Sequence, residues 1–169
     1  MKKLILLSAT VLSLSAGTVY AHTANITVHQ ANELYTRLAA ENRGVNYDNA
    51  FGFQCVDIPG DLTLNYVGKP IYGNAIDLLD SARAAGYEIV PADKSPRVGD
   101  IFVMDAWTLY GHGYGHTGYI WQVNPDGSFE TVEQNVGYDA NLYYGTPARL
   151  VHRTRDYMLG YIRLDYQKD

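Results

Sequence analysis

Apolar residues follow a helical spacing early in the chain and a strand-like pattern later. Between residues 28 and 39 they recur three and four positions apart, which predicts an amphipathic helix. Thr27 and Gln30 match a capping box at its start, and Gly44 is placed to stop it in a left-handed conformation. A further helix is expected from Asn74, a good N-cap residue, to Gly86.

From residue 87 onward the apolar runs are short and rich in aromatic and β-branched residues, as is typical of strands. The turn sequence Asn-Pro-Asp-Gly at 124–127 joins two of these runs and predicts an antiparallel hairpin. The expected strands are 87–90, 101–104, 117–123, 129–134 and 159–164. Helices followed by strands predict an α+β domain, with N-terminal helices packed on a mostly antiparallel sheet.

The first 21 residues have the pattern of an export signal. Lys2 and Lys3 precede an apolar run that is shorter than the roughly 20 residues a membrane-spanning helix needs, and the segment ends in Val-Tyr-Ala. We therefore expect residues 1–21 to be a cleaved signal peptide and residues 22–169 to form one domain. The expected location is secreted, periplasmic or cell-wall associated, with no stable membrane anchor after cleavage.

The charge of the chain argues against nucleic acid as a partner. The sequence has 13 basic and 18 acidic residues, and loss of Lys2 and Lys3 with the leader lowers the net charge from −5 to −7. Phosphate backbones and anionic lipids are bound largely through clustered Lys and Arg, and the sequence shows no such cluster.

Cys55 is the only cysteine of the chain. A lone cysteine is often a small buried core residue. Exported domains, however, usually use cysteines in pairs, so an unpaired thiol outside the cytoplasm indicates a reactive residue. A position in the first turn of a helix would favour its thiolate. Pro59-Gly60 is expected to kink or briefly break that helix.

Histidine is the usual base for a cysteine nucleophile. His116 directly precedes an apolar strand that would hold it rigidly, whereas His112 lies between glycines and is expected to be mobile. His152 lies among arginines in an expected loop. His112 and His116 have the spacing of a metal pair, but that spacing needs a helix and the nearby glycines disfavour one.

A third group should accept a hydrogen bond from the histidine and orient it. The predicted hairpin brings residues 133–135 to the same end as His116. Strand alternation places Glu133 and Asn135 on one face and Gln134 on the other, so either Glu133 or Asn135 is a candidate.

Taken together, these motifs resemble those of the CHAP family, the cysteine, histidine-dependent amidohydrolases/peptidases. The resemblance implies a papain-like fold and cleavage of bonds in bacterial peptidoglycan. It implies that Cys55 is the nucleophile, His116 the base and Glu133 the residue that orients His116, with Asn135 as a further polar member and Gln54 helping to stabilise the oxyanion. The motifs that carry it are Gly52-Phe53-Gln54-Cys55-Val56-Asp57, Gly73-Asn74-Ala75, Pro96-Arg97-Val98-Gly99-Asp100-Ile101, Gly115-His116-Thr117-Gly118 and Glu133-Gln134-Asn135.

Some CHAP domains of phage lysins also carry a calcium site before the cysteine. Asn46, Asp48 and Asp57 match its side-chain positions, although the first of these is commonly Asp. Hard oxygen ligands suit calcium. Plain Asx-turn chemistry explains the same residues, and both interpretations remain open.

The function indicated by these residues is that of a secreted peptidoglycan hydrolase, an amidase or an endopeptidase. Two alternatives keep the same scaffold: a non-catalytic module that binds the cell wall, and a toxin. No separate wall-binding module is expected in residues 22–169, so targeting would come from this domain, from confinement or from a partner protein. The sequence does not identify such a partner or an inhibitor.

Overall fold

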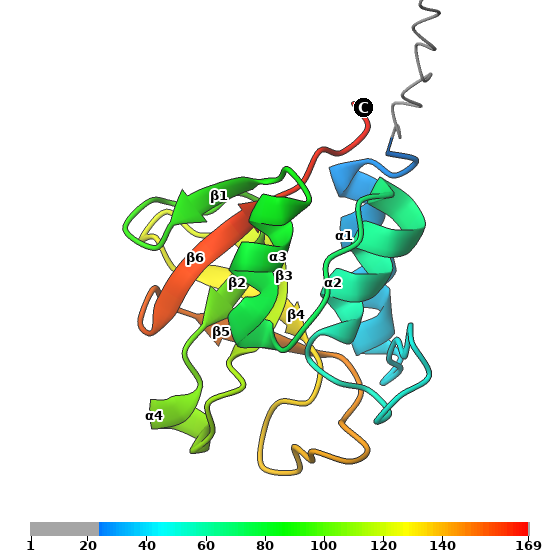
Figure 1. Ribbon diagram of the computed structural model, residues 1–169, viewed down its shortest axis with the longest axis vertical. Helices are drawn as coiled ribbons and strands as arrows, with labels where there is room; N and C mark the ends of the chain where they lie inside the picture. The colour runs from blue at the N-terminus through cyan, green and yellow to red at the C-terminus, as the bar shows by residue number, and fades with distance from the viewer. Residues whose placement is uncertain (1–23, 169) are drawn as a thin grey trace, which may run out of the picture.

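The computed structural model describes residues 24–168 and shows helices packed on a sheet (Figure 1). The cleavage site expected after Ala21 lies outside the described residues. The helical elements are α1 (Val28–Ala40), α2 (Asp57–Asp61), the π-helix η1 (Leu62–Val67), the 3₁₀-helix η2 (Ala75–Asp77), α3 (Leu78–Ala84) and α4 (Trp107–Tyr110). The strands are β1 (Glu88–Pro91), β2 (Ile101–Met104), β3 (His116–Val123), β4 (Phe129–Glu133), β5 (Arg149–Arg153) and β6 (Met158–Arg163).

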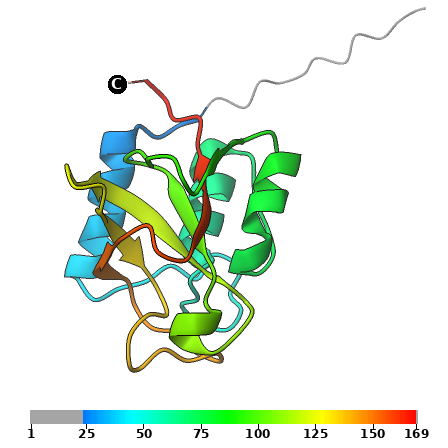
Figure 2. The ribbon, with the colours of Figure 1, turned by 90° about the vertical axis from the view of Figure 1, so that its left-hand side faces the viewer.

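Within the described range the six strands form one sheet in the order β1-β6-β2-β3-β4-β5, and every neighbouring pair is antiparallel. The strands β3 and β4 pair from Val123 and Phe129 outward, so the hairpin predicted around residues 124–127 is confirmed. In Figure 2 the strands lie in front of α1 and α2. The α+β arrangement predicted from the sequence is confirmed.

The helix α1 begins as predicted and ends differently. Thr27 and Gln30 form the expected capping box. The left-handed residue that ends the helix is Asn42, with φ of 51°, and not Gly44. The N–H of Arg43 donates to the carbonyl of Leu38, as in a Schellman motif. Asn tolerates this conformation because its short polar side chain can bond locally.

The chain stays helical through Pro59-Gly60, where a kink or a break was expected. Pro59 is the third residue of α2, and the first turn of a helix has no intrahelical use for its N–H groups. The missing N–H of proline therefore costs no hydrogen bond there. The change comes later, where α2 continues directly into the π-helix η1.

The segment around His152 is the strand β5, so its assignment to a loop was wrong. This strand lies at an edge of the sheet and pairs with β4 through its whole length. Its side chains are only partly buried or exposed. An edge strand with charged residues lacks the apolar alternation on which strand prediction depends.

Two clusters of buried residues lie on the two faces of the sheet. One joins α1, α2 and α3 to the strands and includes Tyr35, Ile58 and Tyr119. The other packs rings of Phe102, Phe129 and Tyr161 against one another, from β2, β4 and β6. The core thus fixes the sheet relative to the helices, which is what places α2 beside β3.

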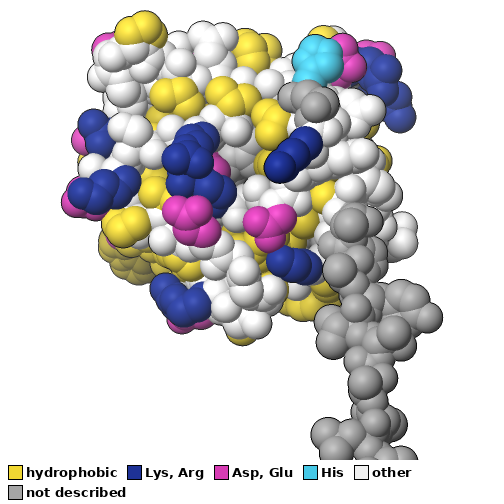
Figure 3. Space-filling view, turned by 90° about the horizontal axis from the view of Figure 1, so that it is seen from above, with side chains coloured by type: hydrophobic (Ala, Val, Ile, Leu, Met, Phe, Trp, Pro, Cys, Tyr) yellow, Lys and Arg dark blue, Asp and Glu magenta, His cyan; other side chains and the backbone are white. Residues whose placement is uncertain are grey.

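The loops 41–56, 105–115 and 134–148 gather at the lower end of the molecule in Figure 1. Seen from above, the opposite end shows basic and acidic side chains interspersed with apolar ones (Figure 3). In the part of the chain that the structure describes, no helix combines the length and the apolar character needed to cross a membrane.

Candidate active site

Cys55 lies in a tight turn that leads into α2. The carboxylate of Asp57 accepts the N–H of Gln54 at 2.6 Å, and the N–H of Asp57 donates to the Gln54 carbonyl at 3.2 Å. These two bonds close the turn around the cysteine. Since α2 begins at Asp57, Cys55 precedes the helix by two residues and is not part of its first turn as the structure assigns it. The side chain is partly buried and lines a pocket.

His116 and Glu133 face each other across the β3–β4 hairpin. His116 is the first residue of β3 and Glu133 the last of β4, and Nε2 lies 2.7 Å from Oε2. Both side chains are buried, with 4% and 0% of their surface exposed. The sequence left Glu133 and Asn135 open as the orienting residue, and the structure brings Glu133 to the histidine.

The environment of His116 favours its charged form. Burial opposes that charge, but the Glu133 carboxylate and a hydrogen bond with Cys55 outweigh it and raise the pKa of His116 to about 10. Since Nε2 is engaged by Glu133, the ring nitrogen that remains for the thiol is Nδ1. Cys55 and His116 line the same pocket, and Glu133 holds the opposite nitrogen of the histidine ring.

Arg153 also belongs to this cluster, and the sequence reasoning missed it. Its Nε lies 2.8 Å from Oε1 of Glu133, and its Nη2 lies 2.7 Å from Oε2. Thr131 donates its hydroxyl to Oε1 at 2.6 Å. Burial opposes ionisation of Glu133, but Arg153 and His116 lower its pKa to about 2. A buried carboxylate requires a cationic partner, and that requirement is the signal that points to an arginine.

Gln54 and Asn135 meet at one side of the pocket. The amide of Asn135 donates to Oε1 of Gln54 at 2.8 Å, and Nε2 of Gln54 donates to the carbonyl of Phe51 at 2.5 Å. Asn135 follows the end of β4 with φ of 52°, so strand alternation no longer applies to it. It therefore bonds Gln54, while Glu133 bonds His116.

Gln134 holds the loop that precedes the cysteine. Its side chain accepts the N–H of Val45 at 2.6 Å and donates to the carbonyls of Val45 and Gln54 at 2.9 and 3.0 Å. This buried residue was predicted on the opposite face from Glu133, and it binds a different partner, as that prediction requires.

The two loops beside the cysteine are joined by a short bridge between Phe53 and Gly145. The N–H of Phe53 donates to the carbonyl of Tyr144 at 3.0 Å, and the N–H of Thr146 donates to the carbonyl of Phe53 at 3.2 Å. Gly145 has φ of 58°, and a Cβ there would lie 1.9 Å from the Phe53 oxygen. A glycine is therefore required at this contact.

His112 packs against two tyrosines, and its mobility, expected from its glycine neighbours, stays a prediction. Its ring stacks on Tyr110 at 6.1 Å and contacts Tyr114 at 5.6 Å between centroids. It lines the same pocket as Cys55 and His116. Among the side chains of residues 24–168, no group of three or more His, Cys, Asp or Glu residues could hold a metal ion.

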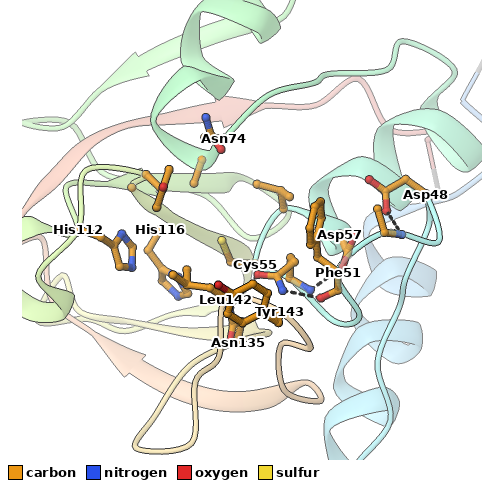
Figure 4. Close-up of a pocket in the computed structure, with 16 residues that line it drawn as sticks. Asp48, Phe51, Cys55, Asp57, Asn74, His112, His116, Asn135, Leu142 and Tyr143 are labelled. Carbon is orange, nitrogen blue, oxygen red and sulfur yellow. Dashed lines mark hydrogen bonds between the residues drawn. The ribbon is translucent and has the colours of Figure 1, made fainter.

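The pocket in which these side chains meet has a volume of about 430 Å³. Figure 4 shows Cys55, His112 and His116 at one part of its wall, with Asn135, Leu142 and Tyr143 nearby and Phe51 and Asp57 across from the histidines. Phe51, Leu142 and Tyr143 are at least 57% exposed. The partly buried Cys55 and the buried His116 thus lie beneath an open rim of apolar and aromatic side chains.

The three residues considered for calcium lie in and beside the loop before Cys55. Asn46 Oδ1 is buried and has no hydrogen-bond partner within the described structure. Burial and, to a smaller extent, repulsion from Asp48 and Asp61 raise the pKa of Asp57 to about 7. The hydrogen bond from the Gln54 N–H lowers that pKa but does not outweigh them. Asp48 accepts the N–H of Ala50 at 2.9 Å, which is an Asx turn. An unpaired oxygen and neighbouring carboxylates fit a hard cation, while Asp48 also fits the turn interpretation.

Comparison with known proteins finds a matching family and a similar phage protein. The family model described as CHAP domain matches residues 44–135. The endolysin PlyTW of Staphylococcus phage Twort is 31% identical over 125 residues, which are 69% of this chain and 25% of the phage protein. The chain thus spans about a quarter of the length of that relative.

Two solved structures share the fold. The wild-type endolysin LysIME-EF1 is 29% identical with a TM-score of 0.72, over 84% of this chain and 66% of the other. The structure of Ly7917 is 17% identical with a TM-score of 0.59, over 82% and 62% of the two chains. Together with the layered arrangement of helices and antiparallel sheet, these similarities confirm the papain-like fold.

Proposed function

The chain belongs to the CHAP domain family, and from that premise we propose that it is a peptidoglycan hydrolase that cleaves an amide bond with Cys55 as nucleophile. The observation that carries the proposal is the buried His116–Glu133 pair, whose histidine lines the same pocket as the partly buried Cys55. A non-catalytic wall-binding role would need none of these contacts. The two endolysins that resemble the chain support the same substrate.

The first chemical step is attack of the Cys55 sulfur on the amide carbonyl. This attack requires a thiolate. The environment of His116 favours the charged imidazolium, which would pair with that thiolate. The carbonyl oxygen then becomes an oxyanion. Gln54 is proposed to stabilise this oxyanion, for which its amide would exchange the bond to the Phe51 carbonyl for one to the substrate.

The second step is collapse of the tetrahedral species. His116 donates its proton to the leaving nitrogen, the C–N bond breaks, and the amine departs while the acyl group remains on the sulfur. The neutral His116 then removes a proton from water, whose oxygen attacks the thioester and releases the acid. Glu133 keeps the ring in one orientation through both steps, because it holds Nε2 at 2.7 Å.

The pocket rim is proposed to receive the peptide stem and the adjoining sugar. Exposed apolar and aromatic groups such as Phe51, Leu142 and Tyr143 suit sugar faces and short aliphatic side chains. Such a rim is compatible with both amidase and endopeptidase activity. The chemical structure of the cleavage products distinguishes the two.

Calcium is proposed to bind Asn46, Asp48 and Asp57 together with nearby carbonyl groups. The support is the unpaired oxygen of Asn46 and the raised pKa of Asp57. When bound, the ion would offset the carboxylate charges and stabilise the loop before Cys55. Export through residues 1–21 is likewise proposed, on the sequence pattern alone.

Purified protein incubated with peptidoglycan tests the function. Amide cleavage releases new amino groups and no new reducing sugar ends, and mass spectrometry of the fragments identifies the bond. The matched control is Cys55→Ala, which removes the sulfur and keeps the fold. Wall digestion by that variant, or release of reducing ends by the wild type, would contradict the proposal.

A further inference from the structure

We propose that Arg153 is a positioning residue of the active site, which acts through Glu133 by holding that carboxylate as an anion directed at His116. The inference rests on the proposed function, since it gives Arg153 a part in the chemistry of Cys55 and His116. Arg153 lies on β5, 98 positions after the cysteine, in a segment whose sequence shows no strand pattern.

The contact between Arg153 and Glu133 is a paired one. Two nitrogens of the guanidinium meet the two carboxylate oxygens at 2.8 and 2.7 Å, which fixes the plane of the carboxylate as well as its distance. The same Oε2 that contacts Arg153 lies 2.7 Å from His116 Nε2. Rotation of Glu133 would break both contacts, so the arginine also determines where the histidine finds its acceptor.

Burial explains why this carboxylate depends on the arginine. The Glu133 side chain has no exposed surface and that of Arg153 is 13% exposed. An isolated carboxylate at such a site would take up a proton, because water cannot solvate its charge. Arg153 provides the permanent positive charge, which stays through the catalytic cycle while His116 gains and loses its proton.

The arginine is itself held by a second residue. Its Nη2 donates to the hydroxyl of Tyr110 at 2.8 Å, and the Tyr110 ring lies 5.3 Å from that of His116. Tyr110 is the last residue of α4. The titratable groups that face the Arg153–Glu133 pair are therefore His116 on β3 and Tyr110 on α4, with Cys55 beyond the histidine.

Alkylation of the single thiol gives a test that needs no substrate. The rate of Cys55 modification by iodoacetamide follows its thiolate, and the decline of this rate toward low pH reports protonation of that anion. In Arg153→Gln, Glu133 loses its counter-charge and becomes protonated at a higher pH. The acid limb of the alkylation profile is expected to move upward by about one pH unit or more.

Two further variants separate this role from a structural one. Arg149→Gln removes another arginine of the same strand. Arg149 pairs with Glu133 through the strand register, but its guanidinium donates to Asp139 and to the Val136 carbonyl, so the acid limb of this variant should coincide with the wild type. Arg153→Lys keeps the charge and loses the paired geometry. Its limb should stay at the wild-type position while kcat on peptidoglycan falls several-fold with little change in KM.

An acid limb of Arg153→Gln that coincides with the wild type, or an equal shift in Arg149→Gln, would overturn the inference. If Arg153→Gln does not fold, Arg153→Lys decides: a lowered kcat supports the positioning role and a wild-type kcat refutes it. Failure of every variant and of the wild type to digest peptidoglycan would instead refute the proposed function, and the alkylation profiles would still report on Arg153.

Discussion

His116 and Glu133 are 17 residues apart in the chain and meet at 2.7 Å because one hairpin turns between them. The turn at 124–127 sets the pairing of β3 with β4, and the two residues lie at the open end of that pairing. The catalytic arrangement therefore depends on hairpin register. A shift of one residue would move Glu133 to the other face of the sheet.

Replacement of Cys55 by serine is expected to abolish hydrolysis and leave the fold intact. Serine has nearly the same size, but it does not form its anion near neutral pH as a thiol does. His116→Ala should lower kcat by about 10²-fold to 10⁴-fold, since it removes the acid and base. Turnover on purified peptidoglycan measures both, with circular dichroism to confirm folding. His112→Ala is the matched control and should lower kcat much less. A larger loss of activity in that variant would show that His112, and not His116, is the base.

Replacement of Glu133 by glutamine is expected to destabilise the protein in a pH-dependent way. The folded pKa of His116, about 10, lies above its ordinary 6.5, so this part of the stability is full below pH 6.5 and is lost as pH rises through 10. The folded pKa of Glu133, about 2, lies below its ordinary 4.5, so its part is present above pH 4.5 and is lost as pH falls through 2.

The difference in unfolding free energy between wild type and Glu133→Gln should therefore be largest between pH 4.5 and 6.5 and shrink toward pH 10. Urea titrations at several pH values measure it. Glu130→Gln is a suitable control, because Glu130 pairs with His152 at the exposed side of the same strands. A difference that is constant from pH 5 to pH 10 would contradict the coupling of His116 to Glu133.

Calcium is expected to stabilise the protein more above pH 7 than at pH 5. The folded pKa of Asp57, about 7, lies above its ordinary 3.8, so folding favours the neutral acid and stability declines as pH rises through 7. A bound cation offsets that charge and contributes about 2.7 kcal/mol at a concentration 100-fold above Kd. Thermal unfolding with and without a chelator measures the effect.

Asp48→Ala should behave like the chelated wild type and stop responding to calcium, while magnesium should not replace calcium. Asp57→Asn should lose both the calcium response and the decline with pH. Equal melting temperatures with and without chelator, for protein freed of metal, would leave Asn46 and Asp48 to turn chemistry alone.

Export is expected to remove residues 1–21, so N-terminal sequencing of the mature protein should begin at His22. The apolar segment is too short to remain as an anchor. Replacement of Ala21 by a large residue, for example Ala21→Trp, should slow processing. A mature protein that begins at Met1 and stays with the membrane would show that the segment is retained.

The sequence predicted the residues that lie within one hairpin and missed the residue that reaches them from another strand. Counting outward from the 124–127 turn is enough to bring His116 and Glu133 to the same end of the hairpin, although it does not predict the register shift between Ile120 and Gln122. The connection from β4 to β5 covers residues 134–148, and its length sets no register. Arg153 therefore could not be assigned to Glu133 by counting.

Local signals were equally limited where tertiary contacts decide. Gly44 has the freedom to end a helix, but Asn42 ends it, and Gly44 serves a close contact in which a Cβ would lie 2.7 Å from the ring of Phe53. Pro59 suggested a break because the sequence does not show where in the helix it lies. At the third residue of α2 it is compatible with the helix.

The bridge between Phe53 and Gly145 means that the two loops that border the pocket are attached to each other at their base. Phe51 lies two residues before Phe53, and Tyr143 lies two residues before Gly145. Neither loop can therefore shift as a whole without moving the other. The width of the pocket entrance would then change only at the ends of these two loops. Phe51 lies at one such end, and its φ of 57° is a backbone angle that bulky residues rarely adopt. A wide, branched peptidoglycan fragment would therefore enter through a change in conformation of these loop ends, while the part of the pocket beside the Cys55 thiol keeps its dimensions.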